Sequence, residues 1–411
     1  SFEFSTIGGA VANNAAGEKS LKYGVTRDYV KSLRVVLANG EVIETLRLNK
    51  RELSKKLGLS TFEGEIYRAI DTLIEENRET VDSLQLTVSK NSAGYALANV
   101  KQQDGSFDLT PLIVGSQGTL GIVTETTFET EVYNPETTLF MAEFDDLAKA
   151  AQAVMQLRAL PSLPSAIEMV DGQLLNLVHR LNPNQLKGIV SEPFPKIVLL
   201  VEFDDSKVSV RKKLAKKADK ILSEYAQKHV QETEPAAQER LWKVRHSAAS
   251  VISHSEGQLK ALPIIEDGVV PPEKLEELIG SVYRLFDTAN LQVALWGHAG
   301  DGNIHMQPFL DLSQVGDRQK AFKLIDEYYR LVISLGGSTS GEHGDGRLRA
   351  PYLELLYGTK AYTLLQKVKQ IFDPYDILNP GVKINVSLED IKPLVRNSYS
   401  LEHLYDHMPR S

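Results

Sequence analysis

A short sequence echo constrains the fold of this chain more than any other feature. The apolar, strand-sized run from Thr138 to Phe144 contains Glu-Phe and continues into Asp145-Asp146 before a helical pattern. The run from Ile197 to Phe203 ends the same way and continues into Asp204-Asp205, again before a helical pattern. Repeated strand-then-helix units are typical of split βαβ sandwiches, in which helices pack on a sheet. The echo therefore predicts an α+β domain in the middle of the chain.

Further elements continue this pattern toward the C-terminus. We expect a helix from Glu273 to Asp287 and strands near 292–296 and 304–309. A long helix should follow, opened by Asp317 as its cap and ended by Gly336-Gly337. Its inward side chains should be Phe322, Ile325, Tyr329 and Val332.

The N-terminal third shows a different organisation. Asn39-Gly40 divides two β-runs between Ser32 and Leu46, which predicts a hairpin, and apolar spacing predicts a helix from Glu65 to Asn77. Residues 111–125 place a glycine-rich turn between two β-like runs. Pro135 then marks a domain boundary.

Composition excludes several classes of protein and of site. The 411 residues contain no cysteine, so disulfides, thiolate metal sites, cysteine nucleophiles and iron–sulfur clusters are excluded, and a metal would need His, Asp or Glu. The chain has a net charge of −8, and its sequence has no long block of basic residues, which argues against nucleic-acid and membrane partners. Apolar runs are too short for a transmembrane helix. The start lacks Met and a signal pattern, so we interpret it as truncated or processed and expect a cytoplasmic protein.

Two glycine-rich turns carry the residues most suited to chemistry. In Trp296–Gln307, strand-like arms flank a turn, so His298 and His305 can converge from its two sides. Glu342 lies in a similarly glycine-flanked loop, and two His with one Glu leave coordination positions open for a substrate. The alternative is that these are hydrogen-bonded strand histidines and a solvated acid.

A third glycine-rich segment opens the chain. Residues 6–17 and 22–26 let the backbone approach a ligand closely and offer free amides, although a pair of tight turns would have the same composition. This is not the dinucleotide fingerprint of a Rossmann unit.

Together the motifs resemble one family. Thr-Ile-Gly-Gly at residue 6, Val-Gly-Ser-Gln-Gly-Thr-Leu-Gly-Ile-Val-Thr at 114, Gly-His-Ala-Gly-Asp-Gly-Asn-Ile-His at 297 and Gly-Glu-His-Gly at 341 are similar to flavoproteins of the vanillyl-alcohol oxidase type. The resemblance is to their D-lactate, glycolate and D-2-hydroxyglutarate dehydrogenase branch, and it ends in Phe372–Gly381.

The resemblance implies a fold and a cofactor. FAD would lie between a two-part flavin domain, of which 1–134 is the second part, and a cap domain of 135–365 built on an antiparallel sheet, with 366–411 as a helical segment returning to the flavin domain. The family's first flavin subdomain would precede residue 1. The residues implied to line the flavin are Gly8, Gly9, Asn13, Gly17, Gly24, Gly118, Thr119, Gly121, Ile122 and Asn379.

It also implies a reaction and the residues that perform it. The substrate would be a small D-2-hydroxy acid of the lactate, glycolate or 2-hydroxyglutarate class, oxidised to the 2-oxo acid. His298, His305 and Glu342 would hold a divalent metal (zinc, manganese, cobalt or iron), and His343 would be the general base. Arg245 and Lys260 would bind the substrate carboxylate.

Several points stay open at this level. Gln307 stands where many relatives have Asn, a change we interpret as mild. The electron acceptor after the flavin has no sequence signal, and a homodimer is the expected assembly. Two alternatives remain: a metal-free alcohol or sugar oxidase of the same fold, and a flavin-free, non-catalytic fragment or subunit.

Overall fold

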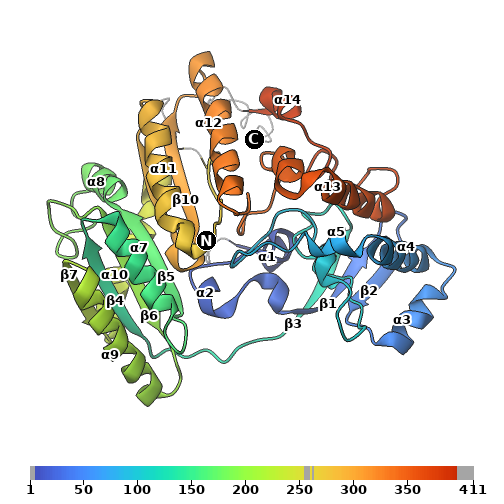
Figure 1. Ribbon diagram of the computed structural model, residues 1–411, viewed down its shortest axis with the longest axis horizontal. Coiled ribbons are helices and arrows are strands. Elements are labelled where there is room, and N and C mark those ends of the chain that lie inside the picture. Colours follow the sequence, from blue (N-terminus) through green and yellow to red (C-terminus); the bar gives the residue numbers. More distant parts are fainter. Residues whose placement is uncertain (1–4, 254–259, 262, 396–411) are drawn as a thin grey trace, which may run out of the picture.

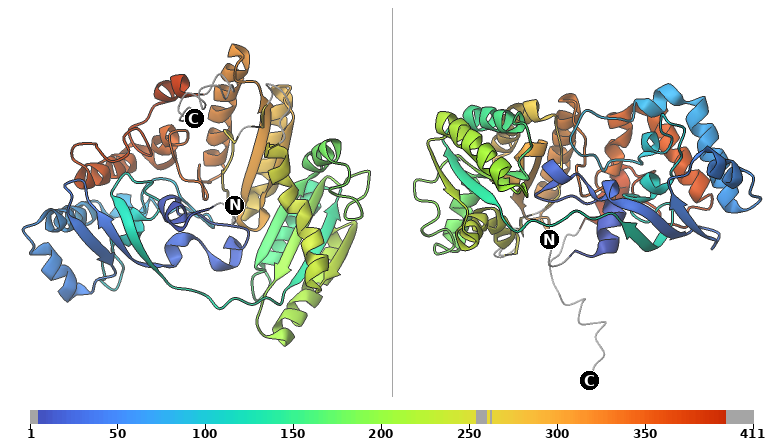
Figure 2. Two further views of the ribbon diagram at one scale, coloured as in Figure 1. Left: turned by 180° about the vertical axis from the view of Figure 1, so that it is seen from behind. Right: turned by 90° about the horizontal axis from the view of Figure 1, so that it is seen from below.

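The computed structural model describes residues 5–253, 260–261 and 263–395. It has two lobes that lie side by side in every view (Figures 1 and 2). Two large apolar clusters define them: the first lobe contains residues 5–134 and 353–385, and the second contains 135–352. An extended connection from β3 to β4 runs between the lobes.

A small antiparallel sheet organises the first lobe. Its strands are β1 (Val30–Val36), β2 (Val42–Leu46) and β3 (Ile122–Phe128), in the order β2-β1-β3. The predicted hairpin is confirmed, because β1 and β2 pair in register around Asn39-Gly40 and Gly40 has a positive φ of 87°.

One predicted strand of this lobe is wrong. The apolar run before the glycine-rich turn forms a short helix, α6 (Thr110–Ile113), rather than a β-arm. Pro111 lies at its first turn, where the fixed φ of proline favours a helix, and Asp108 accepts a hydrogen bond from the Thr110 amide. Only the run after the turn is a strand.

Helices complete the first lobe. The helix predicted from Glu65 to Asn77 is α4, capped by Thr61. It spans Phe62–Glu76. The lobe also contains α1 (Ile7–Asn13), α2 (Ser20–Tyr23), α3 (Lys50–Leu57), α5 (Arg78–Asp82) and α13 (Leu353–Phe372).

The expected domain limit at 365 falls inside α13, whose buried side chains from Leu353 to Phe372 pack in the first lobe. Beyond it, α14 (Leu388–Ile391) turns back, and Leu388 packs against the second lobe.

A seven-stranded sheet organises the second lobe, in the order β7-β4-β6-β5-β9-β10-β8, and every pair in it is antiparallel. This confirms the predicted antiparallel sheet covered by helices. The strands are β4 (Thr138–Phe144), β5 (Ala166–Asp171), β6 (Ile197–Phe203), β7 (Lys228–Glu232), β8 (Lys260–Ala261), β9 (Val293–His298) and β10 (Asn303–Leu310).

Helices cover both faces of this sheet. One face, with the larger apolar cluster, carries α7 (Leu147–Arg158), α9 (Val208–Tyr225), α11 (Leu275–Thr288) and α12 (Val315–Ser334). The other face carries α8 (Gly172–Leu181) and α10 (Pro235–Ser253). Successive strand residues point to opposite faces, so side chains of β5, β9 and β10 divide between the two layers.

The start of α12 corrects another expectation. The helix begins at Val315 after Gln314, so Asp317 is not its cap but lies in the first turn. The Asp317 carboxylate instead accepts a hydrogen bond from the Asp311 amide in the loop before the helix. Ile325, Tyr329 and Val332 are buried as predicted.

Among the described residues, no helix combines the length and apolar composition needed to cross a bilayer.

Candidate active site

Three strands of the second lobe bring polar side chains to one face of the sheet. On β9, Val293 and Leu295 pack in the larger cluster, so Trp296 and His298 point to the α8–α10 face. The same alternation places His305 of β10 and Glu168 of β5 on that face. The pairing of Asn303 with His298 leaves His305 on the diagonal, and the two imidazole centroids are 5.2 Å apart.

Both imidazoles point at one carboxylate oxygen. His298 Nε2 and His305 Nε2 each lie 3.0 Å from Glu342 Oε1, and the three side chains are buried. Glu342 reaches them from the loop after α12. The Asp267 carboxylate fixes this loop by accepting from the backbone amides of Glu342 and His343 and from the Ser340 hydroxyl. The structure therefore assembles the three predicted metal ligands.

A second carboxylate holds the far nitrogen of each histidine. His298 Nδ1 lies 2.7 Å from Glu168 Oε1, and His305 Nδ1 lies 3.2 Å from Glu266 Oε2. A carboxylate only accepts, so each Nδ1 carries hydrogen and each Nε2 is the nitrogen left to bind a metal. This is the arrangement of metal-ligating histidines.

The spacing of the three ligand atoms also fits one ion. Two ligands that each lie about 2.1 Å from an ion are at most about 4.2 Å apart. The two 3.0 Å contacts to Glu342 fall within that limit, whereas the three ligand atoms together lie within the wider distance of 4.8 Å. A divalent cation is therefore compatible with the residues present.

The charge on these groups follows from their surroundings. Burial alone would lower the pKa of His298, but the charges of Glu168 and Glu342 outweigh it and raise this pKa to about 9. Burial would raise the pKa of Glu342, but His298 and Lys90 hold it well below its usual range. Without a bound cation, the carboxylate is thus ionised and His298 is protonated at neutral pH.

Lys90, which the sequence did not single out, brings the first lobe into the site. Its ammonium lies 2.6 Å from Glu342 Oε2, the oxygen that the histidines do not use, and its side chain is almost fully buried. It also contacts the Ser20 hydroxyl, which donates to Asp301 in the turn between β9 and β10.

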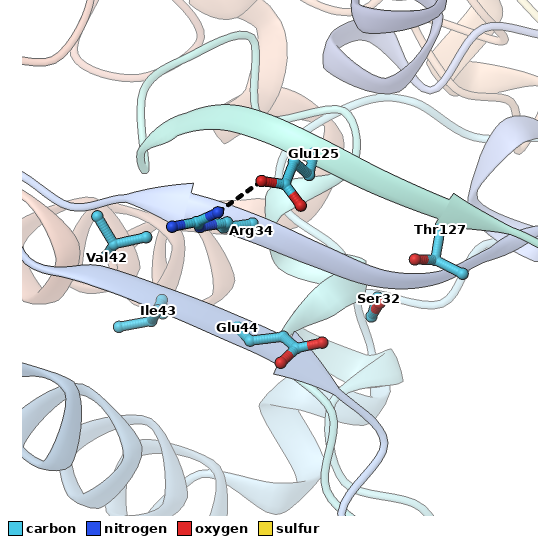
Figure 3. A pocket seen from close by; sticks show the side chains of 7 residues that line it. All are labelled: Ser32, Arg34, Val42, Ile43, Glu44, Glu125 and Thr127. Carbon is cyan, nitrogen blue, oxygen red and sulfur yellow. Dashed lines mark hydrogen bonds and ion pairs between the residues drawn. The ribbon is translucent and has the colours of Figure 1, made fainter.

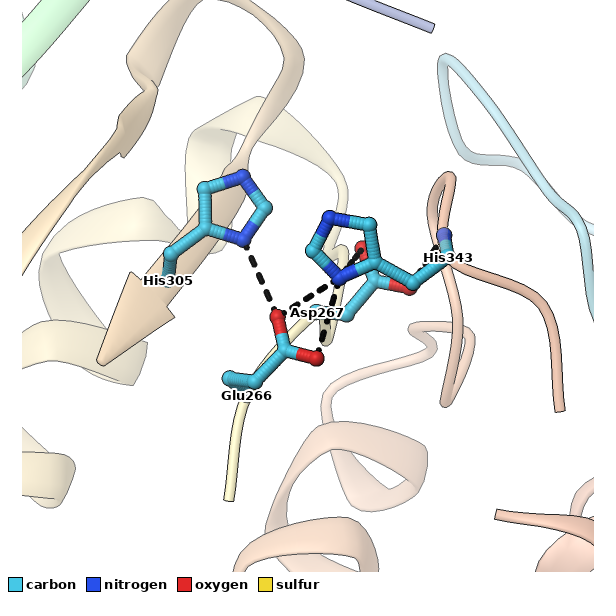
Figure 4. Close-up of side chains that lie close together, drawn as sticks. All are labelled: Glu266, Asp267, His305 and His343. Atoms are coloured by element: carbon cyan, nitrogen blue, oxygen red, sulfur yellow. Dashed lines mark hydrogen bonds and ion pairs between the residues drawn. The ribbon is translucent and has the colours of Figure 1, made fainter. Parts of the chain in front are cut away.

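The predicted base, His343, lies beside this group (Figure 4). Its ring stacks on His305 with centroids 5.0 Å apart, and its side chain is about half exposed. His343 Nδ1 lies 2.9 Å from Glu266 Oε2, and Arg349 donates to the other oxygen of Glu266. His343 Nε2 lies on the side of the candidate metal ligands, 3.7 Å from Glu342 Oε1.

Negative neighbours control the protonation of His343. Burial of the ring would lower its pKa, but Asp267 and Glu266 raise it to about 10. Burial would raise the pKa of Glu266, whereas His343, His305 and Arg349 together hold it far below its usual range.

The structure describes only one of the two side chains predicted to bind the substrate carboxylate. Arg245, on α10, donates from Nε to Glu168 Oε2 at 2.7 Å, the same carboxylate that holds His298. Arg245 is thus placed next to the candidate metal ligands. The backbone of Lys260 pairs with Leu310 at the sheet edge, but the side chain of Lys260 lies outside the described residues.

Three of the ten predicted flavin residues meet around Gln117, and two more lie in α1, the helix that carries Asn13. Gly8, Gly9 and Asn13 belong to α1, and the Gln117 amide donates to Asn13 Oδ1. Asn379 donates to the Gln117 carbonyl, while Gly118 follows Gln117 directly. Within the described residues, no atom lies within 4 Å of the place where a Cβ would stand at Gly8 or at Gly118. This open, glycine-lined edge is the surface that a planar ligand could approach.

The other five have more local roles in the described structure. Gly24 has a positive φ and closes a turn against Asp28, while Gly121 packs against Val35 of β1. Thr119 is fully buried, and its hydroxyl bonds Tyr95 and the Ser116 carbonyl. Ile122 is exposed on the small sheet, and Gly17 is exposed in the turn before α2.

The small sheet also carries a shallow pocket away from these groups (Figure 3). It lies on the outer face of β1, β2 and β3, where Arg34 pairs with Glu125, and it contains none of the predicted site residues. Its lining residues are Ser32, Arg34, Val42, Ile43, Glu44, Glu125 and Thr127.

Sequence reasoning missed three buried charged groups: Glu168, Glu266 and Lys90. Each had a signal. Glu168 interrupts an otherwise apolar strand, Glu266 follows Ile264-Ile265, and Lys90 opens a loop of small and polar residues. Gln307 lies two residues after His305 on the same face of β10, and its buried Oε1 has no hydrogen-bond partner among the described residues.

Family models match most of the chain. The model described as FAD linked oxidases, C-terminal domain, matches residues 134–382, and that of an FAD binding domain matches residues 1–46.

Curated relatives agree with these matches. The chain is 32% identical to the glycolate oxidase subunit GlcD of Bacillus subtilis, covering 93% of the chain and 68% of that subunit. It is 30% identical to the D-2-hydroxyglutarate dehydrogenase of Haemophilus influenzae, covering 92% of the chain but 38% of that enzyme. It is 29% identical to a D-lactate dehydrogenase of Anaerostipes hadrus, covering 92% and 69%. The chain is therefore shorter than the relatives it matches.

Solved structures share the fold at low identity. A 4-ethylphenol oxidase from Gulosibacter chungangensis superposes with a TM-score of 0.61 at 14% identity, over 94% of this chain and 71% of that one. An alkyldihydroxyacetonephosphate synthase superposes with a TM-score of 0.52 at 18% identity, over 92% and 59%.

Proposed function

The chain belongs to the FAD-linked oxidases, and on this premise we propose that it forms the larger part of a flavin-dependent dehydrogenase that oxidises a small D-2-hydroxy acid. The observation that carries the proposal is the convergence of His298 and His305 on Glu342, with a carboxylate behind each histidine. The names of the relatives supply the substrate class: glycolate, D-lactate and D-2-hydroxyglutarate.

The flavin would lie along the glycine-lined edge around Gln117. The open space over Gly8 and Gly118 and the exposed side chain of Ile7 support this placement. Oxidation of a 2-hydroxy acid removes a hydride from carbon and a proton from the hydroxyl, and bound FAD supplies the hydride acceptor. The chain itself has no cysteine that could take part in redox chemistry.

The divalent ion would be held by His298, His305 and Glu342. Such an ion polarises the hydroxyl and carboxylate oxygens of a substrate. Lys90 occupies the second oxygen of Glu342 and so leaves a single oxygen for the ion. Carboxylate and imidazole ligands suit zinc, manganese, cobalt and iron alike.

The remaining residues bind the acid and take its proton. Arg245 would pair with the substrate carboxylate through its terminal nitrogens, because Glu168 uses only Nε. His343 would accept the hydroxyl proton at Nε2, since Glu266 holds Nδ1. His343 is protonated at neutral pH without a metal. Its Nε2 lies 3.7 Å from Glu342 Oε1, so a cation held by Glu342 would lower the pKa of His343. Lys260 stays a proposed second carboxylate contact.

The alternatives differ in metal content. An alcohol or sugar oxidase of the same fold would have no use for the two histidines and Glu342, and a non-catalytic subunit would need neither metal nor flavin. Cytoplasmic location and a homodimer stay predictions.

The test uses the natural protein that carries this chain. Metal content and the visible flavin spectrum are measured first, and then D-lactate, glycolate and D-2-hydroxyglutarate are added without oxygen. We expect one divalent ion per chain and bleaching of the flavin by at least one acid, both lost in His298→Ala. A protein without metal, or with a flavin that none of the acids reduces, would contradict the proposal.

A further inference from the structure

One carboxylate links the candidate metal ligands to the candidate substrate clamp. Glu168 lies on β5, one residue before the pair Met169–Gly297, so its side chain stands across from His298. Its side chain is 1% exposed, and its two oxygens have different partners. Oε1 lies 2.7 Å from His298 Nδ1, and Oε2 lies 2.7 Å from Arg245 Nε.

We propose that Glu168 is a positioning residue that couples substrate recognition to metal binding, by holding Arg245 and His298 with one rigid carboxylate. The proposal rests on the function given above and adds a residue to it. The consequence is that the carboxylate clamp and the metal ligand cannot shift independently of each other.

The geometry on the arginine side supports a clamp. Glu168 contacts the guanidinium from the side, at Nε. Within the described part of the chain no acceptor contacts the terminal nitrogens of Arg245, so this edge of the guanidinium stays available. Two terminal nitrogens in one plane match the two oxygens of a carboxylate.

The geometry on the histidine side supports a ligand. A carboxylate behind Nδ1 fixes the tautomer and orientation of the ring and makes Nε2 a stronger donor to metal. Glu168 is buried where α10 packs on β5, which shields both of its contacts from solvent.

An amide at this position can serve only one partner. In Glu168→Gln, one oxygen accepts while the NH₂ group must face the other donor. If the oxygen faces His298, then the NH₂ group faces Arg245 Nε–H; if the amide is flipped, it faces His298 Nδ1–H and favours the tautomer that cannot bind metal through Nε2. If the carboxylate only fixed α10 to the sheet, the substitution would not force the loss of either the metal contact or the arginine contact.

The experiment measures two affinities on the 411-residue chain. Co²⁺ is titrated by its visible spectrum, and glycolate is then titrated into the Co²⁺-loaded chain by calorimetry. The variants are Glu168→Gln, Arg245→Met and the double variant. The control is Glu202→Gln, a buried carboxylate on the neighbouring strand that pairs with Lys19.

We expect Glu168→Gln to weaken Co²⁺ binding about 10- to 100-fold, or to weaken glycolate binding to the level of Arg245→Met. Arg245→Met should weaken glycolate and leave Co²⁺ nearly unchanged. In the double variant, the loss of glycolate affinity should be no larger than in Arg245→Met alone, because the effects share one contact. In Glu168→Gln alone, the guanidinium of Arg245 is left without its carboxylate, and this can prevent folding. The double variant removes that guanidinium as well, so the coupling can still be measured in it.

Three patterns separate the possible failures. If the unaltered chain binds Co²⁺ and glycolate but Glu168→Gln matches Glu202→Gln in both affinities, the coupling is wrong and the proposed function stands. If additive losses appear in the double variant, the coupling is likewise wrong. If the unaltered chain takes up no Co²⁺, the metal site of the proposed function fails, and the coupling with it.

Discussion

The two halves of the proposed site are built on opposite principles. In the second lobe, His298, His305 and Glu342 are buried, and partners hold every one of their nitrogen and oxygen atoms. On the edge around Gln117, the surface consists of glycine and backbone, and Ile7 is 68% exposed. A metal site needs fixed side chains, whereas a flavin edge needs room. The difference indicates that the metal half is preformed and the flavin half is completed by its ligand.

The largest effect should follow removal of one ligand. His305→Ala deletes an Nε2 without touching the Glu168 contact, and we expect stoichiometric Co²⁺ uptake to be lost, a decrease beyond the about 100-fold expected for an outer partner. His229→Ala is the control, because His229 lies in the same sheet and bonds Asp219. Unchanged uptake in His305→Ala would show that the ion binds elsewhere, and this would break the contrast between the two halves.

Lys90 tests whether the preformed half depends on the first lobe. Lys90→Met leaves Glu342 Oε2 buried without its cation, which should destabilise the chain by about 3–5 kcal/mol. Denaturant unfolding measures this change. Lys101→Met, which removes a more exposed pair with Asp71, should cost at most about 1 kcal/mol. Equal losses in the two variants would argue against a special role of Lys90.

The protonation of His298 predicts how metal uptake depends on pH. Its pKa of about 9 means that Nε2 loses a proton when it binds a cation below that pH. The protonated His298 ring contributes to the folding stability of the metal-free chain. This contribution is fully present below the ordinary histidine pKa and is lost as pH rises through about 9. Apparent Co²⁺ affinity should therefore rise about tenfold per pH unit from pH 7 toward 9 and then level off. A flat profile over this range would contradict the assigned ligand.

The smallest effect separates flavin contact from stability. Gly8→Ala adds a methyl group to α1 where no atom of the described residues lies within 4 Å, and so it should stabilise the chain by up to about 1 kcal/mol. If Gly8 borders the flavin, FAD affinity of the natural protein should fall several-fold in a spectral titration. Gly316→Ala, in the open first turn of α12, should bring the same stability gain with unchanged FAD affinity. Identical FAD affinity in both variants would remove Gly8 from the flavin edge.

Local patterns predicted the fold and part of the site. Asn39-Gly40 located the hairpin, and the two echoed runs coincide with β4 and β6 residue for residue. His298 and His305 were found because they lie on either side of one turn. Short elements were less predictable: Pro111 converted an apolar run into α6.

The missed residues share one cause. Glu168, Glu266 and Lys90 act through partners far away in the sequence; Lys90 and Glu342, for example, are separated by 252 residues. Periodicity and turn chemistry report neighbours within about one turn or one hairpin, whereas these pairs depend on the tertiary fold. The expected cap at Asp317 was wrong for a different, local reason: its carboxylate accepts from the amide of Asp311, six residues earlier in the loop, rather than capping the helix.

The long separation of Lys90 from Glu342 has a consequence for the chain during its synthesis. At about 5–20 residues per second, a ribosome needs roughly 13 to 50 seconds to pass from the lysine codon to the glutamate codon. Throughout that interval the ammonium has no carboxylate to receive it, so its loop cannot close as it does in the finished protein. The nascent first lobe should therefore stay accessible to proteases and chaperones until the glutamate loop has emerged, together with α13, which follows it in the chain and completes the core of this lobe.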